Sequence, residues 1–475
     1  MAAPLRPHSS ALGRIFAATC AFLLSACLLF CAPAKALAYV LPSDVVAGTP
    51  MLDRDLTLAQ QIDIDAPYAC MIDNYGTIYF ERGAHVPLKI ASMTKIMTAI
   101  VALENSASTD IVVVSHAAAT VGESTANLRE GDQMTMFSAL CCMLIPSGND
   151  AATAVAETIG AKALALGWDL GLDEGEAAPT DALTAFVCLM NKKAREMGLE
   201  DSYFTNPHGL DDGIWAGEQH STPYDVVLMA QYAMRFEDFR RIVRSSGATI
   251  DLVREGETRQ LFLTTTDWFL ASYDYANGIK TGSTDLAGYC FVGSSQYMDL
   301  ELYAVVLQSA SENDRFVDVQ AMHIWGFLHR ITYKVANSDE VLTIDDDGVT
   351  KEVPLFAEVA HPGWIDRTFK TYLENPDEIL TIFDIDGNVT QQVVFDNLEG
   401  NVKAGDVVGV VHFMQHNQVL CTKNIIAAED CKAPNMFQSV GVWFDRMKLW
   451  FKGEDTVAIT RIVNTLPRVI DKTMA

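Results

Sequence analysis

The sequence predicts an α/β domain followed by a smaller all-β domain and a C-terminal amphipathic helix. In the first part of the chain, strand-like stretches are interspersed with apolar helical stretches; from residue 341 onward, short strands are separated by turns. Large apolar residues recur at helical spacing in the tail. The chain has 475 residues, 49% of them hydrophobic and 20% charged, which indicates a globular protein of two or three domains.

The first predicted domain, residues 39–335, combines two hairpins with several helices. Residues 67–81 read as two short strands around Asn-Tyr-Gly, and residues 277–308 read as a second hairpin. From Ser92 to Glu104 the apolar spacing is helical and covers nearly the whole circumference, so this helix is expected inside the domain. Further helices are expected over 151–159 and 185–197 and up to Trp325–Leu328, with a surface excursion over 165–181.

The second predicted domain, residues 340–433, lacks the pattern of long helices. Its strands are expected in the stretches ILTIFDID, VTQQVVFD, DVVGVVHF and QVLCTKNIIAA. Cys421 and Cys431 lie in this β-rich region and are the candidate disulfide pair. The remaining cysteines read mostly as small core residues, and none has a metal-ligand spacing.

The tail, residues 434–475, is predicted to contain an amphipathic helix. Its apolar face is formed by Phe437, Val440, Phe444, Met447 and Phe451, extended by Trp443 and Trp450. Large apolar residues with two tryptophans at that spacing are typical of a helix lying in a membrane interface. The alternative is a helix that packs on the β-rich domain.

The N-terminal 38 residues read as an export signal. Two arginines precede an apolar run over Ile15–Cys31, and small residues lead to a cleavage site after Ala38. A lipoprotein box ending at Cys27 is the second interpretation, and an uncleaved anchor is the third. The mature protein is therefore expected outside the cytoplasm.

The chain is acidic, with a formal net charge of −27 and a sequence pI near 4.6. Nucleic-acid binding requires clustered lysine and arginine to neutralise phosphates, so this class of partner is excluded. The excess of acidic residues is expected to lie on a solvated surface.

The first candidate catalytic motif is ASMTKIMTA, in which Ser92 and Lys95 lie at i and i+3 on one helical face. Serine becomes a nucleophile when a neighbouring base removes its proton, and a neutral amine can do this. Burial and a second cation lower the pKa of a lysine and make the neutral amine available. Alone, however, the spacing is weak evidence, because roughly one or two occurrences are expected by chance.

The second motif is PSGNDAA, which contains Ser147 and Asn149. Residues two apart on a regular helix point in different directions, but an irregular turn around Gly148 would let the hydroxyl and the carboxamide converge. Asn149 or Asp150 is then a candidate cap for the helix that follows.

The third motif is NGIKTGSTD, which supplies Lys280, Thr281 and Gly282. Lys280 is the second cation that the first motif requires, and it favours an anionic substrate group. Glycine weakens a strand unless another backbone approaches closely, so Gly282 indicates a peptide substrate laid along this strand.

In this order the three motifs resemble the Ser-x-x-Lys, Ser-x-Asn and Lys-Thr-Gly set of penicillin-recognising serine enzymes. The chain is similar in particular to the low-molecular-weight penicillin-binding proteins, the serine-type D-alanyl-D-alanine carboxypeptidases of peptidase family S11. The similarity includes the stretches FTNPHGLDD, HSTPYD, GIKTGSTDLAGYCFVG and WGF. It covers residues 50–330 strongly, and residues 341–433 and the tail more loosely. It implies a β-lactamase/transpeptidase-like domain, an antiparallel sheet flanked by helices.

The resemblance also implies catalytic roles. Ser92 would attack the carbonyl between the two terminal D-alanines of a peptidoglycan pentapeptide, with Lys95 as the base. Ser147 would pass the proton towards the leaving amine. Water would then release the acyl-enzyme, whereas a penicillin would acylate Ser92 without prompt release.

The substrate-binding residues that the resemblance implies are Asn149, Lys280, Thr281, Gly282, Ser283 and Arg315. Asn149 would hold a substrate amide, and Lys280 and Thr281 would serve the terminal carboxylate. The backbone N–H groups of Ser92 and Ser283 would form the oxyanion hole. Arg315 would meet the carboxylate, with a surface salt bridge as the competing interpretation.

The predicted function is thus an exported D-Ala-D-Ala carboxypeptidase that trims pentapeptides, limits cross-linking, binds β-lactam antibiotics and contacts the outer face of the cytoplasmic membrane through its tail. No metal or organic cofactor is implied, and His208 and His220 read as structural. The alternatives are a serine β-lactamase, a D,D-endopeptidase of the same fold and an inactive cell-wall-binding protein. Ser147-Gly-Asn149 differs from the Ser-Asp-Asn form of β-lactamases.

Overall fold

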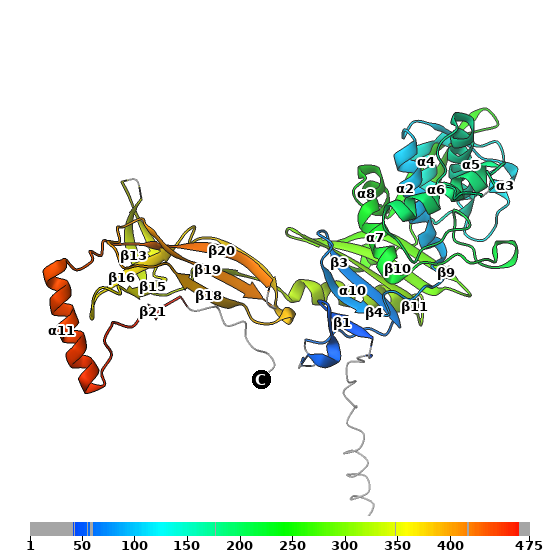
Figure 1. Cartoon of the computed structure of the whole chain (residues 1–475). Coiled ribbons are helices and arrows are strands. Elements are labelled where there is room, and N and C mark those ends of the chain that lie inside the picture. The colour runs from blue at the N-terminus through cyan, green and yellow to red at the C-terminus, as the bar shows by residue number, and fades with distance from the viewer. Residues whose placement is uncertain are drawn as a thin grey trace, which may run out of the picture.

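The computed structural model describes residues 41, 43–54, 56–57, 60–175, 177–346, 348–415 and 418–464 (Figure 1). The predicted export signal and the end of the predicted tail, from residue 465, lie outside the described residues. None of the helices in the described ranges is long and apolar enough to span a bilayer.

The first domain is built on a seven-stranded antiparallel sheet with the order β2-β1-β4-β3-β11-β10-β9. Strand β9 forms one end of this sheet, so among the residues that the structure describes one of its edges has no neighbouring strand. The strands are β1 (Asp44–Val46), β2 (Thr49–Pro50), β3 (Tyr68–Asp73), β4 (Ile78–Arg82), β9 (Ala276–Thr284), β10 (Gly288–Tyr297) and β11 (Leu300–Ser309).

Helices cover both faces of this sheet (Figure 1). Alternation along β3 sends Cys70 and Ile72 into one core with the helical layer, while Ala69 and Met71 pack in a second core with α10. The helices are α2 (Thr94–Asn105), α3 (His116–Ala119), α4 (Met136–Leu144), α5 (Asn149–Leu166), α6 (Ala182–Glu196), α7 (Pro223–Ala233), α8 (Glu237–Val243), α9 (Phe269–Ser272) and α10 (Asp314–Leu328), with the 3₁₀ turns η1 (Met51–Asp53), η2 (Ala91–Met93) and η3 (Gly213–Trp215).

A second, four-stranded sheet with the order β5-β6-β7-β8 belongs to the same domain. Its buried side chains Val112, Met134, Ile250 and Leu252 join the core that is formed with the helical layer. The strands are β5 (Ile111–Val113), β6 (Gln133–Thr135), β7 (Gly247–Arg254) and β8 (Glu257–Thr264).

The C-terminal part of the described chain is built mainly from strands around a core of its own. A six-stranded sheet has the order β18-β19-β20-β16-β15-β21, and β13–β14 and β12–β17 form two further pairs. The elements are β12 (Arg330–Lys334), β13 (Val341–Asp346), β14 (Val349–Pro354), β15 (Ala357–Ala360), β16 (Thr368–Leu373), β17 (Ile379–Phe383), η4 (Asp384–Asp386), β18 (Thr390–Phe395), β19 (Val407–Gln415), β20 (Gln418–Ala427) and β21 (Arg461–Ile462).

Residues of η4 and β17 contact the first domain. The Arg54 guanidinium donates to the Ile385 carbonyl oxygen at 2.6 Å and pairs with Asp386 at 3.1 Å. Ile385 is buried in the core that includes α10, and the Phe383 ring packs edge-on against Trp325. These contacts join the two parts through apolar burial as well as charge.

The helix α11 (Met436–Lys452) carries the predicted apolar face on its exterior. An asparagine capping box opens the helix, and Gly453 in a left-handed conformation ends it. Arg446 on the other side of the helix donates to the carbonyl oxygens of Pro362 and Trp364, which ties α11 to the β-rich part.

Most predicted elements are confirmed, with different boundaries. The hairpin at 67–81 is β3–β4, and the buried helix over Ser92–Glu104 is present but opens with the 3₁₀ turn η2. The helix predicted over 151–159 extends as α5 from Asn149 to Leu166, because alanines continue the helical pattern. Strands β13 to β16 were not anticipated individually, because the sequence analysis predicted short strands from residue 341 without delimiting these four.

The predicted disulfide between Cys421 and Cys431 is wrong, because both are free thiols. Cys421 pairs with Phe413 inside β20, whereas Cys431 lies beyond the strand and bridges Val402. The seven residues from Cys421 to the end of β20 make six extended steps of about 20 Å in all, far more than a disulfide can bridge. A shared β-rich region was therefore insufficient evidence for pairing.

Candidate active site

Ser92 lies in η2, directly before α2, where the chain enters the buried helix. Lys95 in the first turn of α2 is fully buried, and its Nζ donates to Ser92 Oγ at 2.8 Å. The same Nζ donates to Asn149 Oδ1 at 2.7 Å and to the His208 carbonyl oxygen at 2.8 Å. The hydroxyl and the amine predicted to interact are thus in direct contact.

The electrostatic environment favours the neutral form of the Lys95 amine. Burial is the largest cause that lowers the pKa of Lys95 well below its ordinary value, and the charge of Lys280 lowers it further. Asp150 opposes this shift. The two causes predicted from the sequence, an apolar helix and a second cation, are both present.

The turn before α5 brings Asn149 to Lys95 while leaving Ser147 apart. Ser147 is buried in a left-handed conformation with φ of 65°, and within the described chain it forms no hydrogen bond with Ser92 or Lys95. Asn149 Nδ2 donates to the Gly122 carbonyl oxygen at 3.1 Å, so this amide is held on both sides. The N-cap of α5 is Gly148, without a side-chain cap, and not Asn149 or Asp150.

Asp150 instead holds the loop over residues 122–128 against the site. Its carboxylate accepts from the backbone N–H groups of Ala126 and Leu128, each at 3.0 Å, and from the Thr125 hydroxyl. The Ser124 carbonyl oxygen accepts from Asn149 N at 2.8 Å. A motif residue expected to cap a helix therefore shapes one wall of the site.

The third motif lies on β9, beside η2. Lys280 is buried and its Nζ donates to the Thr281 carbonyl oxygen at 2.9 Å, while the Thr281 hydroxyl contacts the Thr266 hydroxyl at 2.7 Å. Burial and the nearby Arg315 lower the pKa of Lys280 to about 7. A Cβ at Gly282 would lie 2.8 Å from the Ile90 carbonyl oxygen, so the predicted close backbone approach is made by the chain next to Ser92.

Arg315 on α10 is buried and lies behind β9. One Nη donates to the Gly282 carbonyl oxygen at 3.2 Å, and the other pairs with Glu312 at 3.0 Å. The salt bridge is thus present, although Arg315 itself is buried, and contact with a substrate carboxylate stays a prediction.

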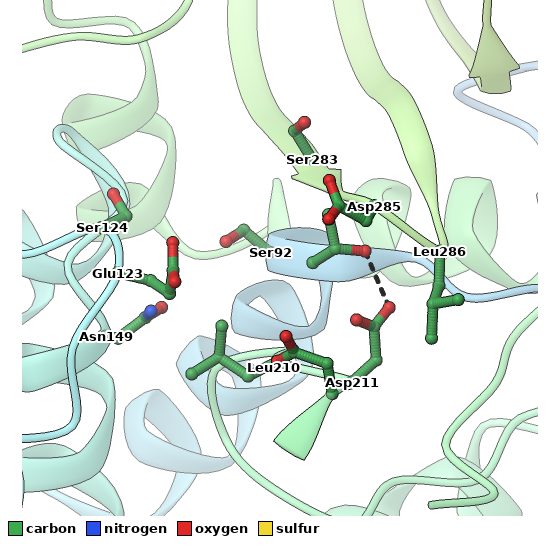
Figure 2. A pocket seen from close by; sticks show the side chains of 12 residues that line it. Ser92, Glu123, Ser124, Asn149, Leu210, Asp211, Ser283, Asp285 and Leu286 are labelled. Carbon is green, nitrogen blue, oxygen red and sulfur yellow. Dashed lines mark hydrogen bonds between the residues drawn. The ribbon is translucent and has the colours of Figure 1, made fainter. Parts of the chain in front are cut away.

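A cavity of about 300 Å³ opens over Ser92 (Figure 2). The predicted residues Asn149 and Ser283 line it. The sequence prediction missed the remaining lining residues, namely Glu123, Ser124, Gly209, Leu210, Asp211, Asp212, Thr284, Asp285 and Leu286. Four of these are carboxylates, so the rim of the cavity is negative, while the cations Lys95, Lys280 and Arg315 are buried.

The segment around His208 packs tightly against the backbone at Ser92, the candidate nucleophile. A Cβ at Gly209, where φ is 94°, would lie 1.9 Å from the Ala91 carbonyl oxygen and 3.0 Å from Ser92 N. His208 itself is buried, and burial lowers the pKa of its ring to about 3. Neither His208 nor His220 belongs to a cluster of potential metal ligands among the described residues.

Comparisons with known proteins agree with this geometry. A family profile described as D-alanyl-D-alanine carboxypeptidase, Peptidase_S11, matches residues 55–164 and 180–311. The D-alanyl-D-alanine carboxypeptidase DacF of Bacillus subtilis is 28% identical over 395 residues, which cover 81% of this chain and 91% of that protein. DacC of Escherichia coli is 28% identical over 393 residues, covering 79% and 86% of the two chains.

Solved structures share the fold. A mutant of the Streptomyces K15 DD-transpeptidase is 28% identical with a TM-score of 0.50, over 56% of this chain and 100% of that one. The carboxypeptidase DacD of Francisella tularensis, 23% identical, has a TM-score of 0.52 over 78% of this chain and 95% of that one. With the family profile matching more than half of its residues, the chain belongs to the S11 family of serine-type D-alanyl-D-alanine carboxypeptidases.

Proposed function

We propose that this chain removes the terminal D-alanine from peptidoglycan pentapeptides through an acyl-enzyme on Ser92. The observation that carries the proposal is the contact between the Ser92 hydroxyl and the buried Lys95 amine, whose pKa is lowered by burial. S11 enzymes are hydrolases that act on peptidoglycan peptides and bind β-lactams, which implies an extracytoplasmic location.

In the acylation step, neutral Lys95 takes the proton of Ser92 Oγ as this oxygen bonds to the carbonyl carbon between the two D-alanines. The backbone N–H groups of Ser92 and Ser283 bind the developing oxyanion. The C–N bond then breaks, and the proton reaches the leaving amine, with Ser147 as the second hydroxyl on its path. In the next step water attacks the ester, Ser92 recovers its proton and the shortened peptide leaves.

We assign substrate binding to Asn149, which lines the cavity, and to buried residues behind its β9 side. Asn149 holds a substrate amide, although in this structure its oxygen accepts from Lys95. Lys280, Thr281 and Arg315 attract the terminal carboxylate, since they are the hydroxyl and the cations on the β9 side. We assign the peptidase domain to residues 39–335 and the β-rich domain to residues 340–433.

The decisive experiment exposes the purified protein to a labelled penicillin and locates the adduct by mass spectrometry. We expect one adduct on Ser92, absent from Ser92→Ala, and release of D-alanine from a pentapeptide by the wild type only. An adduct that persists in Ser92→Ala would refute the assignment. Because the carboxylate of Glu123 lines the same cavity, the release rate is measured too, and rapid penicillin turnover would indicate a β-lactamase instead.

We further propose that α11 places the enzyme on the outer face of the cytoplasmic membrane. The proposal is supported by the exposure of its apolar side chains, with Phe437 at 89%, Trp450 at 69% and Phe451 at 75%. Arg446 holds the opposite side of the helix to the β-rich part, which leaves the apolar face free.

Replacing Phe437 and Trp450 together by serine is expected to reduce binding to phospholipid vesicles at least about tenfold, because each bulky apolar group contributes kilocalories on burial. Co-sedimentation with vesicles containing phosphatidylglycerol measures this. Val349→Ser is the matched control, because Val349 is an exposed apolar residue on β14 outside α11, and it is expected to bind as the wild type does. Equal binding by the double variant and the control would contradict membrane docking by this face.

A further inference from the structure

A buried carboxylate supports the strand segment that carries Lys280. Lys95, Lys280 and Arg315 are all buried, at 0%, 1% and 3% exposure, so three cations share one region of low solvent access. In such a region each positive charge lowers the pKa of its neighbours and favours their neutral forms, unless a nearby carboxylate compensates the charge. Lys280 therefore requires a carboxylate close to it.

Asp267 lies in the connection between β8 and α9 and is 5% exposed. Its Oδ2 accepts from Ile279 N at 3.2 Å, the residue directly before Lys280, and its Oδ1 accepts from Phe269 N at 3.0 Å. At Gly278, where φ is 86°, an added Cβ would lie 2.2 Å from the Val243 carbonyl oxygen, so the start of β9 is tightly confined. The carboxylate therefore anchors the backbone that presents Lys280.

The preceding residue strengthens this anchor. Thr266 contacts the Thr281 hydroxyl at 2.7 Å, and its backbone N–H donates to the Ile145 carbonyl oxygen at 3.2 Å. Thr266 and Asp267 thus join β9 to the segment that leads into Ser147 and Asn149. The short stretch Thr266–Asp267 therefore supports both the NGIKTGSTD strand and the segment before PSGNDAA.

The charged groups around Asp267 come from two neighbouring elements. Lys280 faces it from β9 and Arg315 from α10, and both lower its pKa, whereas burial raises the pKa to about 7. In return Asp267 raises the pKa of Lys280, which burial and Arg315 lower to about 7. Lys280 in turn lowers the pKa of Lys95 on α2, so Asp267 acts on the base only through Lys280.

We propose that Asp267 is a positioning residue for the D-alanine-releasing reaction: it fixes the backbone at Lys280 and is the buried counter-charge that keeps Lys280 cationic for the substrate carboxylate. This inference rests on the proposed function. It assigns no contact with substrate to Asp267, which acts through Lys280.

The sign of the pH effect follows from the two lysines. Activity requires neutral Lys95 and protonated Lys280, so kcat/KM falls at low pH as Lys95 gains a proton and at high pH as Lys280 loses one. In Asp267→Asn the pKa of Lys280 falls, which moves the basic limb to lower pH. The acidic limb is expected to stay in place, because at the lower pH where Lys95 gains its proton Lys280 is protonated and Asp267, with a pKa of about 7, is neutral. The profile therefore narrows from the basic side.

The test measures D-alanine release from a pentapeptide across pH by wild type, Asp267→Asn and Asp267→Glu. We expect KM of Asp267→Asn to rise about tenfold at pH 8 and less than about threefold at pH 6. Loss of one neighbouring negative charge lowers the pKa of Lys280 by about one unit, and this changes its charge more at pH 8 than at pH 6. Asp267→Glu retains the charge and is expected to keep the wild-type profile even with reduced stability.

Asp318→Asn is the matched control, because Asp318 is another buried carboxylate that accepts two backbone N–H groups, those of Asp65 and Ala66. It is expected to lower Tm without changing the pH profile. An Asp267→Asn profile that superimposes on the wild type, or an Asp267→Glu profile as narrow as that expected for Asp267→Asn, would overturn the inference alone. A wild type that releases no D-alanine would overturn the proposed function as well.

Discussion

Replacing Lys95 by methionine is expected to slow acylation of Ser92 by about 10²-fold to 10⁴-fold, the usual contribution of a positioned general base. Methionine fills the buried space of the lysine stem but offers no amine within reach of Ser92 Oγ, which now lies 2.8 Å from Nζ. Even a neutral buried amine costs desolvation free energy, so its removal offsets part of the hydrogen bonds lost at Asn149 and His208, and the fold is expected to persist. The rate of labelled-penicillin adduct formation measures the effect, and circular dichroism checks the fold.

Two further variants separate the role of base from other roles of this side chain. Lys95→Arg keeps a positive charge that cannot be removed at neutral pH, so it is expected to be as inactive as Lys95→Met. Lys162→Met removes a lysine from α5 outside the cavity and is expected to leave acylation unchanged. Wild-type acylation by Lys95→Arg would show that the charge of Lys95, and not its proton acceptance, is what Ser92 requires.

Replacing Gly209 by alanine is expected to lower kcat/KM about 100-fold and to destabilise the protein by about 2–4 kcal/mol. The new Cβ would lie 1.9 Å from the Ala91 carbonyl oxygen and 3.0 Å from Ser92 N, and the φ of 94° disfavours any side chain. The chain at Ser92 must therefore shift, which displaces both the nucleophile and an oxyanion donor. D-alanine release and urea denaturation measure the two effects.

Gly217→Ala is the control for this prediction, because Gly217 lies in the same loop region and an added Cβ would meet nothing nearer than the Thr205 side chain at 3.8 Å. It is expected to retain activity and stability. Acylation of Gly209→Ala at the wild-type rate would mean that the close approach to Ala91 does not hold Ser92 in place.

The sequence was sufficient to predict the site where the chemistry depends on local spacing and residue type. Ser92 and Lys95 meet because residues three apart on a helical turn share a face. The apolar helix around Lys95 indicated the direction of its pKa, and Gly282 indicated a close backbone approach. The first two features are present in the folded protein. The backbone that approaches Gly282 is that of Ile90 in the chain itself, and the peptide substrate along this strand stays a prediction.

The sequence did not predict those parts of the site in which a side chain contacts the backbone of a distant segment or in which a loop lines the cavity. The His208 carbonyl oxygen contacts Lys95, but every residue carries such an oxygen, so no sequence pattern identifies it. Glu123 and Asp211 line the cavity only because their loops are folded back onto it. Asp150 was expected at a helix cap and instead binds the loop that carries Glu123. A shared β-rich region likewise did not bring Cys421 to Cys431.

By itself, then, the sequence predicted a candidate nucleophile, a candidate base and the order of the three motifs, because these are properties of residue type and short-range spacing. Only the tertiary structure decided how the motifs are held: Asn149 and His208 converge on Lys95, and Asp267 lies behind Lys280. The physical reason is that burial and electrostatic compensation depend on which distant segments exclude water together, and this is set by packing of the whole domain.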